Sequence, residues 1–306
     1  MKILVTGASG FIGGYVVKEF ARNSLYSIIA TGRSFTSEFD TLSNVSYLQA
    51  DLAQHFPETS CDVCIHCAGL ADDRATSQEL ERNNVEATNR LLHSLKNCKS
   101  FIYISSSSVY DFEDEQVKTE DDATLNSSLS LYGLSKLKSE DLVRNSNIPS
   151  IYILRPRAVY GPGDRVLMPR ILKLIRKNKV IALGSFQVQT SLTHVHNLYE
   201  AIEKSLIQSA NNIQLFNIAD DCVYNLYEVI GKLAYHKFGH KNFFHIPVWF
   251  IQLIISAQSV LNLRAAVSRQ SLNYMTQNSV LSISKAKQDL QYKGSYTFYE
   301  SIPQLV

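Results

Sequence analysis

Apolar residues in the first half of the chain follow two alternating patterns. Short apolar runs, typical of buried strands, occur at Lys2–Thr6, Ser27–Ala30, Val45–Gln49, Val63–His66, Phe101–Ser105 and Ile151–Leu154. Between these runs, apolar residues at helical spacing predict helices at Ile12–Arg22, Gln78–Lys96 and Leu131–Asn145. This strand–helix alternation predicts an α/β fold with a doubly wound parallel sheet that has helices on both faces.

The alternation becomes irregular after about Pro156, where Pro and Gly cluster in "RPRAVYGPGD" and shorter helical patterns follow. We therefore expect residues 1–160 to form the sheet domain, which also receives later segments such as 190–205. Residues 161–306 are expected to form mainly a smaller C-terminal lobe that rests on the strand ends.

One segment of the second half, Ile246–Leu263, contains no charged residue. Its length reaches the lower limit of a membrane span, but Gln252, Ser256, Ser259 and Asn262 recur at three- and four-residue steps. A single polar stripe on an apolar helix favours a buried or lid helix over a transmembrane segment. The alternative is that this helix contacts a membrane surface or an apolar substrate.

The composition narrows the class of protein further. The chain has 306 residues, of which 45% are hydrophobic and 19% charged, and a formal net charge of +2, so no basic field indicates a nucleic-acid partner. Its five cysteines suit a reducing compartment, and the N-terminus has no secretory signal, so a cytoplasmic location is expected. Cys61, Cys64 and Cys67 lie on a predicted strand, where residues three apart face opposite sides, and we predict no metal site.

A glycine loop gives the first chemical signal. In "ILVTGASGFIGGYVV", Gly7, Gly10 and Gly13 lie between the first strand and the first helix. Glycines at this spacing allow a tight turn and a close approach of a pyrophosphate to backbone N–H groups at the helix N-terminus. The loop therefore predicts a dinucleotide site, whose contacts we assign to Gly7, Ser9, Gly10, Phe11, Ile12 and Gly13.

The end of the second strand bears on the choice of dinucleotide. An NAD site normally has Asp or Glu there to bind the ribose 2′-hydroxyl, but the sequence reads "IIATGRS". Arg33 and Ser34 could instead bind a 2′-phosphate, so we predict NADP, with NAD as the alternative. After the third strand, Asp51 and Leu52 of "ADL" are expected at the adenine.

With these parts, the chain resembles the extended short-chain dehydrogenase/reductase family, of the NAD-dependent epimerase/dehydratase type. The resemblance runs nearly end to end through "TGASGFIG", "ADL", "HCAGLAD", "NNVEATNRLL", "YISSSSVY", "YGLSK", "LRPRAVYGPGD", "THVHNLYEAI", "FNIAD" and "SISKAKQDL". It implies a Rossmann-type domain with a seven-stranded parallel sheet, a substrate-binding C-terminal lobe and a homodimer. It also implies cofactor contacts by Cys67, Ala68, Gly69, Tyr132, Lys136 and Pro156.

The resemblance also implies a catalytic Ser–Tyr–Lys arrangement. Tyr132 and Lys136 are four residues apart and therefore share a helical face, and a nearby ammonium favours the phenolate form of a tyrosine. By its place in the family motif, Ser106 is the functional hydroxyl and Ser107 the neighbour that touches substrate. Asn84 matches the asparagine that steadies the active-site helix and its water relay.

Departures from the family pattern narrow the reaction. Dehydratases usually have an Asp–Glu pair after the catalytic hydroxyl, but Ser107 and Ser108 stand there, so no acid–base pair serves elimination of water. We interpret His194 and His196 as structural rather than catalytic residues.

Three functions remain open at this point. The first is a nucleotide-sugar 4-ketoreductase or 4-epimerase. The second is an enzyme resembling 3β-hydroxysteroid dehydrogenases, with a sterol or a long-chain β-keto or hydroxy acyl substrate. The third is a non-catalytic NADP-sensing protein.

Overall fold

The computed structural model describes residues 1–36, 38–72, 74–126, 128–177, 179–208, 212–260 and 269–305. Its centre is a seven-stranded parallel sheet in the order β14-β8-β7-β5-β1-β2-β3. The strands are β1 (Lys2–Thr6), β2 (Ser27–Gly32), β3 (Val45–Gln49), β5 (Val63–His66), β7 (Ser100–Ile104), β8 (Ser150–Pro156) and β14 (Ile213–Ile218). The order reverses between β1 and β5, and ligands of such sheets bind beyond the strand ends at this point.

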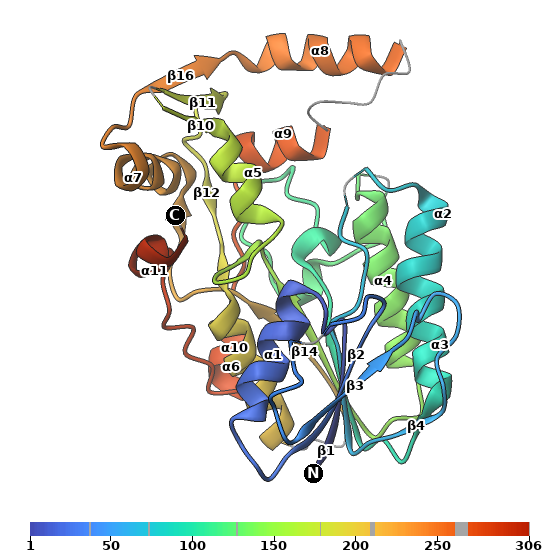
Figure 1. The fold of residues 1–306 in the computed structure, drawn as a ribbon. Helices are drawn as coiled ribbons and strands as arrows, with labels where there is room; N and C mark the ends of the chain where they lie inside the picture. Colours follow the sequence, from blue (N-terminus) through green and yellow to red (C-terminus); the bar gives the residue numbers. More distant parts are fainter. Residues whose placement is uncertain are drawn as a thin grey trace.

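Helices cover both faces of the sheet, as the alternating pattern predicts (Figure 1). One face carries α1 (Phe11–Ala21), α6 (Val195–Ile207) and α10 (Ser284–Asp289). The other carries α2 (Ser77–Leu80), the π-helical turn η1 (Glu81–Glu86), α3 (Ala87–Ser94) and α4 (Leu131–Arg144). The Rossmann-type doubly wound architecture is therefore confirmed.

The predicted helix Gln78–Lys96 differs in detail from the observed one. It begins one residue earlier, because Thr76 and Glu79 form a reciprocal capping box. The π-helical turn interrupts it, and its last two residues form a short strand, β6 (Leu95–Lys96), that pairs with β4 (Thr59–Ser60).

The C-terminal lobe has a core of its own, built around residues such as Phe186, Leu233 and Phe298. Its elements are β9 (Val159–Tyr160), α5 (Leu167–Leu174), β10 (Ile175–Arg176), β11 (Lys179–Leu183), β12 (Gln189–Thr190), β13 (Thr193–His194), β15 (Tyr224–Asn225), α7 (Leu226–Phe238), β16 (Phe243–Ile246), α8 (Val248–Val260), α9 (Arg269–Thr276) and α11 (Phe298–Leu305). Helices α6 and α10 and strand β14 leave this region of the sequence and join the sheet domain. The sheet domain is therefore assembled from the N-terminal half of the chain and from later segments that lie between parts of the lobe in the sequence.

Helix α8 differs from its prediction. One face packs on the lobe core through the buried Ile251 and the partly buried Val248 and Ile255. Gln252 is exposed as the polar stripe predicts, but so are several apolar side chains, and the prediction of a buried helix is wrong for this part. The side chains of Ser256 and Ser259, and Asn262, lie outside the described residues. Over the described ranges, no helix is both long and apolar enough to cross a membrane.

Candidate active site

The glycine loop brings three backbone segments into contact. Gly7 has φ of 70°, and a Cβ there would lie 2.8 Å from the Ala68 backbone nitrogen. A Cβ at Gly13 would lie 2.4 Å from the Gly7 carbonyl oxygen. Glycine has no Cβ, so its presence at these two positions allows the loop to pass close to the N-terminus of α1.

Helix α1 begins without a side-chain cap at Gly10 and without an acidic residue in its first turn. The N–H groups of a first helical turn have no intrahelical partner, and together with the helix dipole they favour a phosphate. The geometry of the loop therefore fits the pyrophosphate of a dinucleotide, whose phosphates would take the place of the missing cap.

A cavity opens beside this loop, and we name it the first cavity. Its lining residues are Gly7, Ser9, Gly10, Thr31, Gly32, Arg33, Ala50, Asp51, Leu52, Ala53, Cys67, Ala68, Gly69, Leu70, Asn83 and Ala87. The sequence predicted Gly7, Ser9, Gly10, Arg33, Asp51, Leu52, Cys67, Ala68 and Gly69 in this set. The predicted contacts Phe11, Ile12, Gly13, Ser34, Tyr132, Lys136 and Pro156 are not among the lining residues.

Gly32 is one of the lining residues that sequence reasoning missed. A Cβ there would lie 2.5 Å from the Ser9 hydroxyl and 2.8 Å from the Tyr47 hydroxyl. The glycine just before Arg33 in "ATGRS" was a usable signal, because a glycine can mark a position where neighbouring groups, here the Ser9 and Tyr47 side chains, leave no room for a Cβ.

The charges at the first cavity come from Arg33 and Asp51. Arg33 is exposed at the end of β2, and Asp51 is the only carboxylate among the lining residues. The Asp51 side chain accepts hydrogen bonds from the Ala53 N–H at 3.0 Å and from Gln54 Nε2 at 2.9 Å. The Ser34 carbonyl accepts a hydrogen bond from the Tyr47 hydroxyl, so Ser34 braces the strand end.

Tyr132 lies in the first turn of α4, whose N-cap Ser130 accepts a hydrogen bond from the Gly133 N–H. Burial raises the pKa of the Tyr132 phenol, whereas the Lys136 ammonium and a hydrogen bond with Ser106 act to lower it. The Ser–Tyr–Lys arrangement is therefore assembled. Without a bound cofactor, the effect of burial exceeds the effect of the Lys136 ammonium. The pKa of Tyr132 is therefore raised, whereas the sequence predicted that it would be lowered.

Lys136 is buried one turn further along α4. Its ammonium donates a hydrogen bond to the Ile104 carbonyl at 2.7 Å and lies 4.3 Å from the centre of the Tyr103 ring. Burial lowers the pKa of Lys136, and the neighbouring Tyr132 opposes that shift. The carbonyl and the ring fix the cation beside Gly69, whose backbone closes the first cavity.

Asn84 connects the glycine-bearing loop after β5 to helix α4. Its side chain accepts from the Leu70 N–H at 2.7 Å and donates to the Ser135 hydroxyl at 2.9 Å. It lies in the π-helical turn η1, a feature common at functional sites. Asn84 therefore positions the loop and the helix relative to each other.

The serine run ends β7 and begins a short 3-10 helix, η2 (Ser107–Val109). Ser106 caps it by accepting from the Ser108 N–H at 3.1 Å. Ser107 is buried, whereas Ser108 lines a second cavity and lies 3.4 Å from the Tyr274 hydroxyl. The 3-10 turn thus directs Ser108, instead of the predicted Ser107, toward open space.

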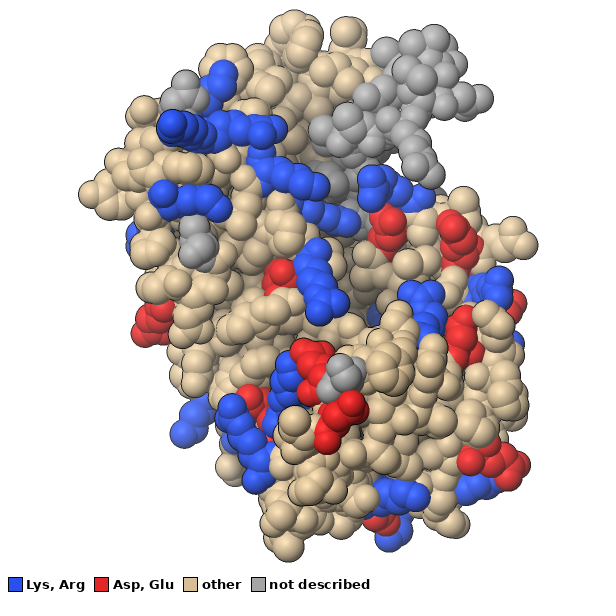
Figure 2. Space-filling model, in the orientation of Figure 1, with Lys and Arg blue, Asp and Glu red and all other residues tan. Residues whose placement is uncertain are grey.

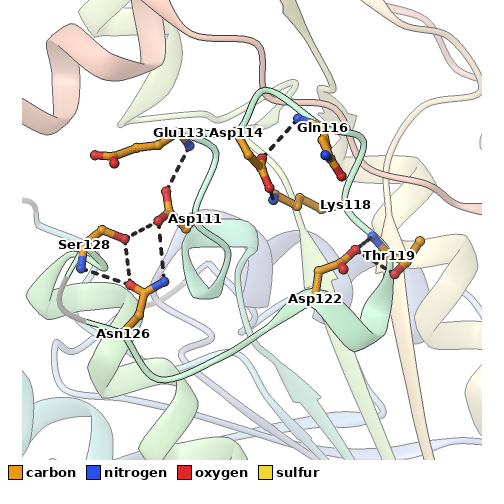
Figure 3. A network of polar contacts seen from close by, with 9 residues as sticks. All are labelled: Asp111, Glu113, Asp114, Gln116, Lys118, Thr119, Asp122, Asn126 and Ser128. Atoms are coloured by element: carbon orange, nitrogen blue, oxygen red, sulfur yellow. Dashed lines mark hydrogen bonds and ion pairs between the residues drawn. The ribbon is translucent and has the colours of Figure 1, made fainter.

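This second cavity lies between the sheet domain and α9. Its lining residues are Ser108, Tyr110, Asp111, Phe112, Glu113, Ser128, Leu129, Ser130, Asn273, Tyr274, Gln277 and Ser279. One wall is a loop held by its own polar contacts, in which Asp111 accepts hydrogen bonds from Ser128 and Asn126, and Asp114 pairs with Lys118 (Figure 3). The loop carries two acidic residues at the cavity, Asp111 and Glu113.

Arg157 lies directly behind the second cavity and was missed in the sequence. It donates hydrogen bonds to Ser279 and Thr190, and its guanidinium packs on the rings of Phe112 and Tyr274, at 4.9 Å and 5.1 Å. Burial lowers the pKa of Arg157 to about 10. This cation lends positive potential to the wall of the cavity.

His194 and His196 occupy structural positions. His194 caps α6 through Nδ1, and burial lowers its pKa to about 4, which keeps the ring neutral. His196 Nδ1 lies 3.0 Å from the Tyr15 hydroxyl. Neither residue is among the lining residues of the two cavities.

Two solved structures have the same fold as this chain. The UDP-glucuronic acid 4-epimerase from Bacillus cereus in complex with NAD has a TM-score of 0.76 at 24% identity, covering 99% of this chain and 96% of that one. MoeE5 in complex with UDP-glucose and NAD has the same TM-score at 23% identity, with coverages of 100% and 97%. These structures confirm the fold.

Sequence comparison identifies relatives and a family for this chain. The UDP-glucose 4-epimerase of Vibrio cholerae is 28% identical over 82% of this chain and 80% of its own length. The sterol-4-alpha-carboxylate 3-dehydrogenase of Dictyostelium discoideum is 25% identical over 99% of both chains. The model of the NAD dependent epimerase/dehydratase family matches residues 3–219. The chain is an enzyme that belongs to the NAD-dependent epimerase/dehydratase family.

Proposed function

We propose that this enzyme oxidises or reduces a secondary alcohol or ketone on a nucleotide-linked sugar, as a 4-ketoreductase or a 4-epimerase. The observation that carries the proposal is the proximity of Ser106, Tyr132 and Lys136, with the Lys136 ammonium beside Gly69 of the first cavity. The relatives named UDP-glucose 4-epimerase and UDP-glucuronic acid 4-epimerase support the substrate class.

Each residue of the site has a distinct task in this reaction. Tyr132 transfers the proton of the alcohol, because its phenol is the titratable group at the serine turn. Ser106 orients the substrate oxygen by a hydrogen bond, and Lys136 stabilises the phenolate. The nicotinamide cofactor supplies or accepts the hydride when bound. Proton transfer by a positioned side chain typically contributes about 10²–10⁴-fold to the rate.

Replacement of the phenol tests this assignment. Tyr132→Phe should remove turnover of a nucleotide-sugar substrate and leave dinucleotide binding nearly unchanged. Tyr235→Phe, at an exposed phenol on α7, is the matched control and should retain full activity. Turnover by Tyr132→Phe at the wild-type rate would exclude the phenol as the proton carrier.

We further propose NADP as the cofactor. The cation Arg33 at the end of β2 and the absence of a carboxylate at that position support it. Titration of NADPH and NADH into the wild type and Arg33→Ala tests the proposal. We expect Arg33→Ala to weaken NADPH by about tenfold or more and to leave NADH unchanged. Arg22→Ala, at an exposed arginine on the same domain, should change neither, and a wild-type preference for NADH would refute the proposal.

A second candidate substrate is an apolar ketone or alcohol, such as a sterol or a long-chain acyl compound. The sterol dehydrogenase that aligns over 99% of both chains favours it. A ligand that binds only the folded state raises the melting temperature, so thermal shifts separate the two classes. Stabilisation by UDP or dTDP supports the sugar, and stabilisation by apolar ketones alone supports the second class. The NADP-sensing alternative is disfavoured because both Tyr132 and Lys136 are present.

A further inference from the structure

Helix α8 exposes an apolar surface at the end of the C-terminal lobe that lies farthest from the chain's N-terminus (Figure 1). Trp249 is 66% exposed, Phe250 43%, Leu253 62% and Ile254 37%, and we name these four residues the α8 patch. Trp249 and Leu253 are neighbours on the helix surface because they are four residues apart, and so are Phe250 and Ile254. The four side chains therefore form two adjacent apolar rows. Their helix is held from behind by Ile251, which is buried in the lobe core.

The charges around this helix have one sign. Residues 165–199 and 229–288 contain no Asp or Glu. The exposed cations of these two ranges include Lys173, Arg176, Lys177, Lys179, Lys237 and Lys241, which we name the basic rim. Figure 2 shows Lys and Arg across this lobe, whereas Asp and Glu are mostly confined to the lower part of the molecule on this face.

The rim and the patch are structurally continuous. Strand β16 leads directly into α8 and pairs with β11, whose first residue is Lys179. The Lys179 ammonium lies 4.8 Å from the centre of the exposed Phe244 ring on β16. Lys179 of the basic rim therefore lies on a strand that is hydrogen-bonded to β16, the strand that leads into the helix carrying the α8 patch.

We propose that the α8 patch and the basic rim dock this enzyme onto the surface of an anionic lipid bilayer. A helix that presents Trp, Phe and Leu beside Lys and Arg lies in the interface plane of a membrane, with the apolar side chains among the acyl chains. The cations then face anionic head groups within a Debye length. The helix lies on the bilayer without spanning it.

Charge also argues against a second copy of this chain as the occupant. A symmetric dimer through α8 would place the same surface on both subunits, and the basic rim would face itself. Like charges opposed across an interface are costly. An anionic bilayer satisfies both the α8 patch and the basic rim. The inference does not depend on which substrate the active site takes.

The chain contains its own probe, because its single tryptophan is Trp249. Vesicles of phosphatidylcholine containing about one third phosphatidylglycerol should shift the Trp249 emission to shorter wavelength, and brominated acyl chains should quench it. Binding should weaken at high salt, because ions screen the rim. Vesicles of phosphatidylcholine alone should bind more weakly.

Two double variants that retain Trp249 test the α8 patch and the basic rim separately. Leu253→Ser with Ile254→Ser should weaken vesicle binding by about tenfold or more, whereas Leu25→Ser, at a 78% exposed leucine of the sheet domain, should not. Lys177→Glu with Lys179→Glu should remove the preference for anionic vesicles, and Lys99→Glu, at the N-terminal edge of the sheet, should keep it. Circular dichroism and melting temperature check that each variant is folded.

Three outcomes would overturn the proposal. The first is an unchanged Trp249 emission with both kinds of vesicle. The second is a shift that depends on protein concentration without lipid and accompanies a dimer mass, which would assign the patch to a second copy. The third is an equal shift with a soluble acidic polymer, which would assign the surface to an acidic macromolecule.

Discussion

Arg155 holds Glu140 through two parallel hydrogen bonds in the buried interior, from Nε to Oε1 at 2.9 Å and from Nη2 to Oε2 at 2.6 Å. Both side chains are almost completely excluded from solvent, with 2% and 1% of their surface exposed. Arg155 belongs to β8, whereas Glu140 follows Lys136 by one turn in α4. The ion pair therefore fixes helix α4 against the sheet.

Removal of one member of this pair is the first prediction. Glu140→Gln removes the carboxylate that is hydrogen-bonded to the buried Arg155 guanidinium, and breaking a buried ion pair in this way typically costs about 3–5 kcal/mol. The free energy of unfolding in urea should fall by that amount. Arg144→Gln is the control, because Arg144 lies 3.6 Å from the same carboxylate but is partly exposed, and exposed pairs contribute about 1 kcal/mol or less. Equal losses in the two variants would contradict this account of the pair.

The second prediction concerns Gly133, which follows Tyr132 in α4. A Cβ at Gly133 would lie 2.0 Å from the Ser108 carbonyl oxygen, so the glycine lets α4 contact the serine turn. Gly133→Ala should displace α4 and reduce kcat at least about tenfold, with a loss of stability. Gly231→Ala in α7 is a matched control, since its Cβ would lie 3.5 Å from the Phe243 ring, and a helical Gly→Ala change there stabilises by about 0.5–1 kcal/mol. Similar behaviour of the two variants would exclude the close contact as the reason for Gly133.

Lys136 gives the third prediction, which concerns the pH dependence of activity. The Lys136 ammonium lowers the pKa of Tyr132 against the effect of burial. Lys136→Met removes this opposition, so the limb of the pH–rate profile that reports phenolate should move to higher pH. The rate at neutral pH should fall by about a hundredfold. Lys138→Met, at an exposed lysine of the same helix paired with Glu81, should leave the profile unchanged. An unshifted profile for Lys136→Met would show that the Lys136 charge does not lower the pKa of Tyr132.

The sequence predicted those parts of the fold that depend on local patterns. The predicted strands Lys2–Thr6, Val45–Gln49 and Val63–His66 match the observed ones. The first and third are short apolar runs because they are buried parallel strands, whereas Val45–Gln49 is a partly exposed edge strand. The glycine loop was equally readable, since Gly7 needs a positive φ that other residues rarely adopt.

Other features depend on contacts between distant segments. The π-helical turn around Asn84 has the same apolar spacing as an ordinary helix, and what marks it is the bonding of Asn84 to Leu70 and Ser135. Arg157 meets Ser279 and Tyr274 only in the folded chain. The exposure of Leu253 could not be predicted from the sequence, because an apolar residue in a helical pattern predicts burial whether or not another element covers it in the fold.

The last prediction concerns stability in acid. Burial, followed by the charge of His196, lowers the pKa of His194 from 6.5 to about 4. The folded state favours the neutral ring, so this contribution is fully present above pH 6.5 and is lost as the pH falls toward 4. Asp220, which accepts from the His194 N–H, acts in the opposite sense, because burial raises its pKa to about 6 and its protonated form is favoured.

A substitution at His194 separates the contribution of this histidine to the pH dependence of stability from the opposite contribution of Asp220. His194→Asn retains a side chain that can cap α6 and keeps the backbone N–H that binds Asp220. Unfolding free energies of this variant and the wild type should therefore converge or cross as the pH falls from 6.5 to 4, by up to about 3 kcal/mol. His93→Asn, at an exposed histidine of α3, should follow the wild type throughout. A constant difference between His194→Asn and the wild type over this range would show that His194 does not titrate on unfolding, and the acid sensitivity would then have to reside elsewhere.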